Sequence, residues 1–145
     1  MEGVIIRAFN HTIEDARQIK EIDGATFADC HYFVEEIINI ARKEENKIYV
    51  AEYDGSMIGF ISLLHVHTLH YDGLWVDLIA VHPKYQNKGI AGKLLEQGKV
   101  YGQEIGADFV SGLVAVNNYA SQKSFRNHDF CDAGKDFQLL LWKRA

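Results

Sequence analysis

Residues 74–95 read LWVDLIAVHPKYQNKGIAGKLL and carry the strongest structural signals in the sequence. Its first eight residues are apolar except for Asp77, which predicts a central strand covered on both faces. Pro83 cannot continue a ladder of hydrogen bonds, so the strand must end there and pass into a polar loop. An amphipathic helix pattern begins at Ile90, directly after Gly89. The sequence therefore predicts a buried strand, a tight loop and a helix in series.

The loop between this strand and this helix has the layout of an anion-binding site. The first turn of a helix has unpaired N–H groups and the positive end of the helix dipole. Glycine at position 89 lets a bulky ligand approach the backbone, and Gln86 and Lys88 add donors beside it. Gly89 and Gly92 could instead serve only loop geometry and close helix packing, so both interpretations stay open.

The remaining hydrophobic patterns surround this unit in a mixed order. They predict a strand, two helices and a hairpin before the central strand, and a strand, a short helix and a final hairpin after its helix. The expected ranges are 4–9, 13–22, 29–45, 47–53, 57–66, 74–81, 90–105, 109–116, 118–128, 130–133 and 137–142. The order β-α-α-β-β-β-α-β-α-β-β predicts an α/β fold with a mixed, mostly antiparallel sheet, in one domain over residues 1–145.

Length and charge exclude several classes of protein. The 145 residues fit one domain, and 48% apolar side chains are enough for its core. A net charge of −5 argues against a nucleic-acid surface. No apolar run reaches the roughly 18 residues of a membrane span, and the N-terminus lacks a signal peptide's basic region. We therefore expect a cytoplasmic protein that binds neither nucleic acid nor membrane, with Cys30 and Cys131 as core or partly buried thiols without a nucleophilic role.

The central stretch resembles the acetyl-coenzyme A signature of the GNAT (GCN5-related) N-acetyltransferases. In that family a strand ending in valine precedes x-P, two further residues, Q/R-x-x-G-x-G/A and an apolar helix. The matching residues here are Val81, Pro83, Gln86, Gly89 and Ala91. The expected element order also resembles the family's over essentially the whole chain. The resemblance implies the GNAT-type acyl-CoA N-acyltransferase fold, with acetyl-CoA as co-substrate.

The resemblance also assigns residues to this co-substrate. Those whose backbone would bind the pyrophosphate are Gln86, Asn87, Lys88, Gly89, Ile90 and Ala91. Those whose main chain would bind the pantetheine arm, as in strand addition, are Ile79, Ala80 and Val81. A second, degenerate family motif places Asn118, Ser121 and Phe125 at the same arm, with Ser where Ala is usual and Phe where Tyr is usual. Asn118 could equally be an ordinary helix cap.

Acetyl transfer to an amine needs a base for the amine's proton and a proton for the departing thiolate. Asp77 is the candidate base, because it lies four residues before Val81, where many family members carry a Glu proposed as base. We expect it to be buried, as a base tuned for this task would be, although a structural aspartate that braces the strand is the alternative.

The family's usual acid for the thiolate is a tyrosine, which Phe125 replaces here. Either Tyr119 or Ser124 substitutes, or the thiolate leaves unaided and takes its proton from water. A thiol pKa of about 8.5 makes the second route feasible, so we expect transfer without an obligatory protein acid.

Three histidines, His65, His67 and His70, form an H-x-H-x-x-H string at the end of the predicted hairpin. Residues two apart share a strand face, so two of them could ligate one ion, but no carboxylate or cysteine at a sensible spacing completes the shell. We therefore expect no metal. In the family the neighbouring strands border the acceptor pocket, which assigns His65 and His67 to its lining.

The segment between the first two predicted helices is rich in aromatic and acidic residues. In the family fold it would lie over the active site, where Phe27, His31 and Tyr32 would suit a cationic amine. The alternative is an amphipathic helix with a solvated acidic face.

Together these features predict an N-acetyltransferase that moves the acetyl group of acetyl-CoA to a primary amine of a small molecule, directly within a ternary complex. The alternatives are a protein N-terminal or lysine acetyltransferase and a non-catalytic acyl-CoA-binding module, the last motivated by Phe125. The sequence leaves the identity of the amine open, and also the oligomeric state, for which the family offers a homodimer.

Overall fold

One five-stranded sheet, in the order β1-β2-β3-β4-β5, organises the computed structural model, which describes residues 1–27 and 32–145. The strands are β1 (Ile5–Ala8), β2 (Asn46–Tyr53), β3 (Ser56–His67), β4 (Asp72–Val81) and β5 (Phe109–Gly112). The helices are α1 (Ile13–Thr26), α2 (Val34–Ala41), the short 3-10 helix η1 (Pro83–Tyr85), α3 (Ile90–Glu104) and α4 (Tyr119–Asn127). Strands β1 to β4 are antiparallel to one another, and β5 runs parallel to β4. The α/β class with a mixed, mostly antiparallel sheet is confirmed.

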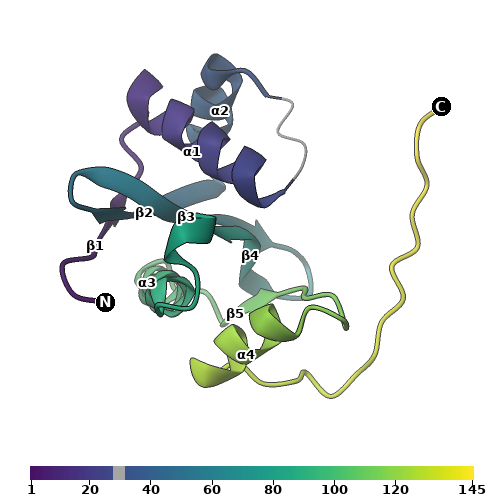
Figure 1. Ribbon diagram of the computed structural model, residues 1–145. Coiled ribbons are helices and arrows are strands. Elements are labelled where there is room, and N and C mark those ends of the chain that lie inside the picture. The colour runs from purple at the N-terminus through teal and green to yellow at the C-terminus, as the bar shows by residue number, and fades with distance from the viewer. Residues whose placement is uncertain (28–31) are drawn as a thin grey trace.

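Helices cover both faces of the sheet, with α1 and α2 on one side and α3 and α4 on the other (Figure 1). Successive residues of a strand point to opposite faces, so the sheet has a core on each side. Phe60 of β3 packs in the core with α1 and α2, whereas its neighbour Ile61 packs in the core with α3 and α4. Both side chains are buried. The continuous apolar run of β4 has the same cause, because Ala80 and Val81 belong to opposite cores.

A charged cluster joins α1 to the first two strands. The guanidinium of Arg7 donates two hydrogen bonds to the carboxylate of Asp15, at 2.8 and 2.9 Å, and one to Glu52, at 2.8 Å. The backbone N–H of Asn10 donates a further bond to Asp15, which is buried. The hydrogen bonds from Arg7 lower the pKa of Asp15, against the opposing effect of burial.

The predicted final hairpin is not formed, and Cys131, which was expected to be in the core or partly buried, is exposed. Residues 130–133 and 137–142 pair with no other strand in the described part of the molecule, and the chain after α4 runs clear of the sheet (Figure 1). Phe130 packs edge-on against Phe125, with the ring centroids 5.0 Å apart, and the chain leaves the core after it. The pattern of residues 137–142 predicts a strand, but a strand forms only where a partner supplies hydrogen bonds.

Two other predicted elements are shorter than expected. β5 ends at Gly112, where its pairing with β4 ends, so residues 113–116 lack a ladder. The second helix spans only Val34–Ala41, because the amide of Asn46 donates to the carbonyl of Ile40 (2.9 Å) and closes its C-terminal end. The start of that predicted helix, with residues 28–31, lies outside the described residues.

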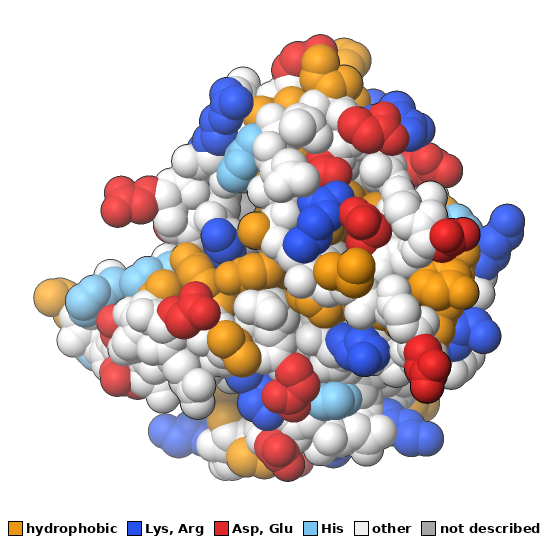
Figure 2. Space-filling model, turned by 90° about the vertical axis from the view of Figure 1, so that its left-hand side faces the viewer, with side chains coloured by type: hydrophobic (Ala, Val, Ile, Leu, Met, Phe, Trp, Pro, Cys, Tyr) orange, Lys and Arg blue, Asp and Glu red, His pale blue; other side chains and the backbone are white. Residues whose placement is uncertain are grey.

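Charges of both signs are mixed on the surface. On the face shown in Figure 2, basic and acidic side chains are interspersed and form no single basic surface. In the part of the chain that the structure describes, no helix combines the length and the apolar character needed to cross a membrane.

Candidate active site

Strands β4 and β5 separate beyond Val76. Their parallel pairing ends with Val76 opposite Gly112, whereas β4 continues to Val81 along β3. At the same level the register between β3 and β4 shifts: Ser62 faces Leu78 and Leu63 faces Val76, which leaves Asp77 as an extra residue in β4. A bulge of this kind bends its strand and re-aims the side chain at the bulge. The second half of β4 therefore presents an edge that β5 does not occupy.

A cavity of about 130 Å³ lies where the two strands have separated. Its walls come from β4, from the chain that follows β5, and from α4. The lining residues are Val76, Asp77, Leu78, Ile79, Leu113, Val114, Ala115, Asn118, Ser121 and Phe125. Five residues that the sequence assigned to one site, from segments forty residues apart, thus meet here: Asp77, Ile79, Asn118, Ser121 and Phe125.

Asp77 is exposed, so the expectation that it is buried is wrong. The sequence pattern placed it inside a strand that neighbours cover on both faces. The bulge and the departure of β5 instead turn it towards the open cavity. An exposed side chain at a bulge is poorly placed to brace the sheet, and well placed to meet a molecule that enters the gap.

The loop after β4 turns its backbone with two left-handed residues. Asn87 has φ 62° and Gly89 has φ 81°, and Gly89 is the N-cap of α3. No side chain caps this helix, so the N–H groups of its first turn lack a side-chain capping partner. A Cβ added at Gly89 would meet no atom within 4 Å. The glycine is therefore required by its backbone angle, and the space beside it is open to a ligand.

Gln86, in this loop, and Gly92, in the first turn of α3, have structural roles that the sequence pattern did not resolve. The side-chain amide of Gln86 donates to the carbonyl of Val81 (3.0 Å) and closes the loop, so that amide is engaged. At Gly92 the packing interpretation is correct, because an added Cβ would collide with the imidazole of His128. Lys88 is exposed.

Helix α4 forms the third wall of the cavity. Asn118 caps it, with the side-chain oxygen accepting from the backbone N–H of Ser121 at 3.1 Å, and it also lines the cavity. The amide of Gln122 donates to the carbonyls of Ala115 (3.0 Å) and Val116 (2.9 Å) and holds the preceding loop. Cap and cavity wall are thus compatible roles for Asn118.

Phe125 closes the inner end of the cavity. It is buried, and its ring lies directly over Gly112, where an added Cβ would be 3.0 Å from the ring carbons. An apolar ring therefore occupies the place where the family motif has its tyrosine.

Comparison with known proteins identifies the family. Residues 10–130 match the family described as the Acetyltransferase (GNAT) family. The chain belongs to this family. No curated protein matches it closely enough to count as a relative.

Several solved structures share the fold. One is AAC(6')-Iy in complex with the bisubstrate analog CoA-S-monomethyl-acetylneamine, with a TM-score of 0.81, 19% identity, and coverage of 98% of this chain and 99% of that one. Another is an aminoglycoside acetyltransferase from an uncultured soil metagenomic sample in complex with trehalose. Its TM-score is 0.82 at 13% identity, and the match covers 99% of this chain and 96% of that one. A ribosomal-protein-alanine N-acetyltransferase from Brucella melitensis has a TM-score of 0.76 at 15% identity, and the match covers 97% of this chain and 100% of that one. The protein is a GNAT-family acetyltransferase.

Two hydroxyl groups proposed as proton donors lie outside the cavity lining of this acetyltransferase. Tyr119 is the first residue of α4, and its side chain is 75% exposed. Ser124 precedes Phe125 on the same helix and does not line the cavity.

His65 and His67 both lie near the carboxylate of Asp72, which was not predicted from the sequence. His65 Nε2 lies 2.5 Å from Asp72 Oδ1, and His67 Nδ1 lies 3.9 Å from the other carboxylate oxygen. Asp72 pairs with His67 across β3 and β4, a contact that chain spacing cannot reveal. Among the described residues, no group of three or more histidines, cysteines and carboxylates is arranged to hold a metal ion. His65 and His67 do not line the cavity at Asp77.

The remaining acceptor residues lie around the segment between α1 and α2. Phe27 follows the end of α1 and Tyr32 precedes α2, and both side chains are about half exposed. His31 lies outside the described residues.

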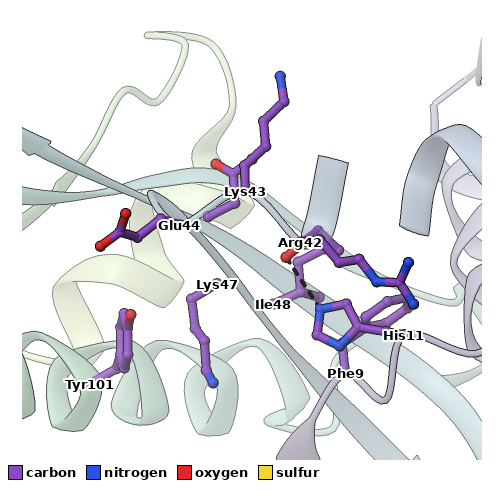
Figure 3. Close-up of a pocket in the computed structure, with 10 residues that line it drawn as sticks. Phe9, His11, Arg42, Lys43, Glu44, Lys47, Ile48 and Tyr101 are labelled. Carbon is purple, nitrogen blue, oxygen red and sulfur yellow. Dashed lines mark hydrogen bonds between the residues drawn. The ribbon is translucent and has the colours of Figure 1, made fainter. Parts of the chain in front are cut away.

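A larger cavity, of about 330 Å³, lies elsewhere, between the end of α2 and the start of β2 (Figure 3). Lys47 lies over the rings of Tyr49 and Tyr101 there, and the ring of His11 contacts the carbonyl of Ala41 at 3.3 Å. Strand β3 separates this part of β2 from β4. We take the smaller cavity as the candidate active site, because it lies between the separated strands and is lined by Asp77, Asn118 and Phe125, whereas this one is not.

Proposed function

We propose that this acetyltransferase moves the acetyl group of acetyl-CoA to the primary amine of a small molecule within a ternary complex. The observation that carries the proposal is the meeting of Asp77, Ile79, Asn118 and Phe125 around one cavity between β4 and β5. Residues that matched two separate family motifs would have no reason to converge if either match were accidental.

The loop before α3 fits the pyrophosphate of acetyl-CoA. Its backbone turns through left-handed angles at Asn87 and Gly89, the first turn of α3 has no side-chain cap, and the space beside Gly89 is open. Backbone N–H groups at a helix N-terminus are suited to phosphate oxygens. Gln86 supports this loop from the strand side through its bond to Val81.

The second half of β4 fits the pantetheine arm. Beyond Val76 its edge towards β5 has no strand partner, so the main chain of Ile79 and Val81 can bind amide groups as a neighbouring strand would. The thioester of acetyl-CoA supplies the acetyl group at the end of this arm. Its reacting carbon would then lie beside Asp77, at the bulge.

Asp77 is proposed to take the proton of the acceptor, directly or through a water molecule that it holds. At neutral pH a primary amine is mostly present as the ammonium ion, which must lose a proton before its nitrogen can attack. Once that proton has moved to the carboxylate, the neutral nitrogen forms a bond to the acetyl carbon and the bond from carbon to sulfur breaks. The nitrogen releases its second proton to water, which balances the proton that the thiolate takes from water. The products are the N-acetylated amine and coenzyme A.

The departing thiolate is proposed to take its proton from water. Phe125 lines the cavity without a hydroxyl, and Tyr119 and Ser124 do not line it. Tyr119→Phe and Ser124→Ala should therefore leave kcat unchanged, whereas a loss of a hundredfold in either variant would identify that hydroxyl as the acid.

A small-molecule acceptor is supported by the aminoglycoside acetyltransferases among the proteins of the same fold. The test is release of free thiol from acetyl-CoA in the presence of neamine-type aminoglycosides, aliphatic diamines, or a peptide with a free N-terminus. We expect release that depends on a small amine. Release with the peptide alone would refute the acceptor class, and no release with any amine would leave the non-catalytic alternative.

Asp77→Asn tests the base in the same assay. We expect kcat to fall by about 10²–10⁴, the usual contribution of a general base. The matched control is Asp54→Asn, at an exposed turn outside the cavity. A thermal shift with acetyl-CoA should be the same in Asp77→Asn and in the natural protein, which separates lost chemistry from lost binding. Full activity of Asp77→Asn would remove Asp77 from the mechanism and leave the transfer itself intact.

A further inference from the structure

The larger cavity, shown in Figure 3, lies outside the candidate active site. Its volume of about 330 Å³ falls within the range of roughly 300–1,000 Å³ that is usual for small-molecule sites. The cavity opens where β2 extends beyond β1: the pairing of these two strands ends with Ala8 opposite Tyr49, and the chain then turns towards α1. The end of α2 and Tyr101 of α3 complete the walls. Segments from four parts of the chain therefore meet around one open space.

The buried part of the cavity wall is apolar. Phe9 and Ala41 are buried, and Ile48 is partly buried against the same core. The lining residues nearer the surface include the cations Arg42 and Lys47. A cavity with an apolar interior and charged groups at its opening suits a molecule with a short hydrocarbon body and charged ends.

Two aromatic rings hold the ammonium group of Lys47. It lies 5.4 Å from the ring centroid of Tyr49 and 5.7 Å from that of Tyr101. Burial, and then the carboxylate of Glu104, raise the pKa of both phenols, so the phenols stay uncharged at neutral pH. No ion pair within 4 Å among the described residues includes Lys47. Contact with the rings thus fixes the position of a cation whose N–H groups can still bind an anion.

The guanidinium of Arg42 supplies a second positive charge. Arg7, Arg17 and Arg126 each donate to a carboxylate. Arg42 is exposed, and its side chain forms no ion pair or hydrogen bond within the described part of the chain. Figure 3 shows its guanidinium on the opposite side of the opening from Lys47. The cavity therefore has one available cation on each side.

The end of α2 is prepared for a negative charge nearby. Carbonyl groups at a helix C-terminus carry the negative end of the helix dipole and repel anions. Here the carbonyl of Ala41 accepts from the ring of His11 (3.3 Å), and that of Ile40 accepts from the amide of Asn46 (2.9 Å). The backbone of His11 is left-handed, with φ 55°, and its ring stands edge-on to Phe9 with centroids 5.2 Å apart. These contacts engage two of the carbonyls that would oppose an anion.

We propose that this cavity binds a small organic dianion, with Arg42 and Lys47 each binding one acidic group and the apolar wall packing against the carbon chain between them. The acidic groups are carboxylates, or a carboxylate and a phosphate, because a guanidinium can donate two parallel hydrogen bonds to either. The carboxylate of Glu44, which also lines the cavity, points away from Arg42 (Figure 3). Strand β3 separates this site from β4, so the proposal does not depend on the acetyl-transfer activity.

The experiment is isothermal titration of the full chain in 0.15 M NaCl, where diffuse charge attraction is screened. The probes are succinate, glutarate and adipate, which differ in the separation of their carboxylates, and 3-phosphoglycerate, which replaces one carboxylate with a phosphate. We expect at least one of them to bind with a Kd below 1 mM. Butyrate and the neutral diamide of glutarate should bind at least tenfold more weakly. Binding by none of the four dianions refutes the proposal, and equal binding of butyrate refutes its two-ended form. The best probe shows whether a phosphate or a second carboxylate is preferred, and either preference supports the proposal.

Matched variants locate the site. Arg42→Gln and Lys47→Gln should each weaken binding of the best probe at least tenfold. The control is Lys43→Gln, which removes the same charge at the next residue but from a side chain that points away from the other labelled residues in Figure 3. It should change the Kd by less than twofold, and equal losses in all three variants refute the site. If Lys47→Gln lowers the Tm of the free protein, Arg42→Gln decides, since that side chain is exposed.

Saturation with acetyl-CoA separates this site from the candidate active site. The Kd of the best probe should be the same with and without acetyl-CoA, because the two cavities lie on different parts of the sheet. Competition between the two ligands would refute the proposal, since the probe would then occupy the coenzyme's site. Binding of the dianion to a protein that transfers no acetyl group would support this proposal and leave the proposed function to fail alone.

Discussion

Replacing Gly89 with aspartate or asparagine separates the backbone requirement at this position from anion binding. Gly89 has φ 81° and no atom within 4 Å of an added Cβ, so a side chain there costs backbone strain without a steric clash. A left-handed conformation costs most residues about 1–2 kcal/mol, and less for Asn and Asp. Both variants should therefore lose no more than about 1 kcal/mol of unfolding free energy, which lowers Tm by about 3–4 °C in a chain of this length.

The two side chains have nearly the same shape and differ in charge. If the N–H groups after Gly89 bind a pyrophosphate, the aspartate places a negative charge beside two others. At about 5 Å and an effective dielectric of 20, each pair of like charges costs roughly 3 kcal/mol, and exposure to solvent reduces this. We expect Gly89→Asp to bind acetyl-CoA at least tenfold more weakly than Gly89→Asn, which corresponds to about 1.4 kcal/mol.

The assay is a thermal-shift titration of both variants with acetyl-CoA, because a ligand that binds only the folded state raises Tm. The shift should persist in Gly89→Asn, diminish in Gly89→Asp, and recover in part at high salt. Equal shifts in the two variants would refute the assignment of the pyrophosphate to this loop, whatever the stability of either protein.

Two further predictions concern stability. Asp15→Asn should lower the free energy of unfolding by about 2–3 kcal/mol at neutral pH. This is less than the roughly 3–5 kcal/mol lost when a fully buried pair is broken, because Arg7 keeps its hydrogen bond to Glu52. Since the pKa of Asp15 is lowered on folding, its contribution to stability is complete above its unfolded pKa of about 3.9 and is lost as the pH falls further. Urea unfolding should therefore show the free energies of unfolding of the natural protein and of Asp15→Asn converge in acid. Gly92→Ala should cost roughly 1–3 kcal/mol by displacing His128, while the control Gly24→Ala, in α1 with nothing within 4 Å, should raise Tm.

The sequence was most informative where one segment carries its own constraints. The strand, the loop and helix α3 follow from local chemistry: Pro83 ends β4, and Gly89 supplies a backbone angle that other residues avoid. The alternating faces of β3 and the cap at Asn118 are likewise local properties. The arrangement of these segments around one cavity could be expected only from the resemblance to a family.

The expectations that were wrong depend on contacts between segments. The exposure of Asp77 comes from the register shift opposite Ser62 and Leu63, which no pattern within β4 reveals. The hydrogen bond from the amide of Gln86 to Val81 corrects no expectation, but it too depends on the path of the loop. The final hairpin is absent because an apolar, alternating segment forms a strand only where a partner strand supplies hydrogen bonds, and none does so within the described residues.

The length of α3 explains why the site lies where it does. Helix α3 has 15 residues and rises about 22 Å, so it returns the chain by about seven strand residues. Measured back from the end of β4 at Val81, that distance leads to Leu74, next to Gly73, where β5 begins its pairing. Four pairs later β5 has ended, and the edge of β4 from Asp77 onward is free. The opening between the strands, next to the N-terminus of the same helix, is thus a consequence of the crossover: one element sets both where β5 starts and where the first-turn N–H groups lie.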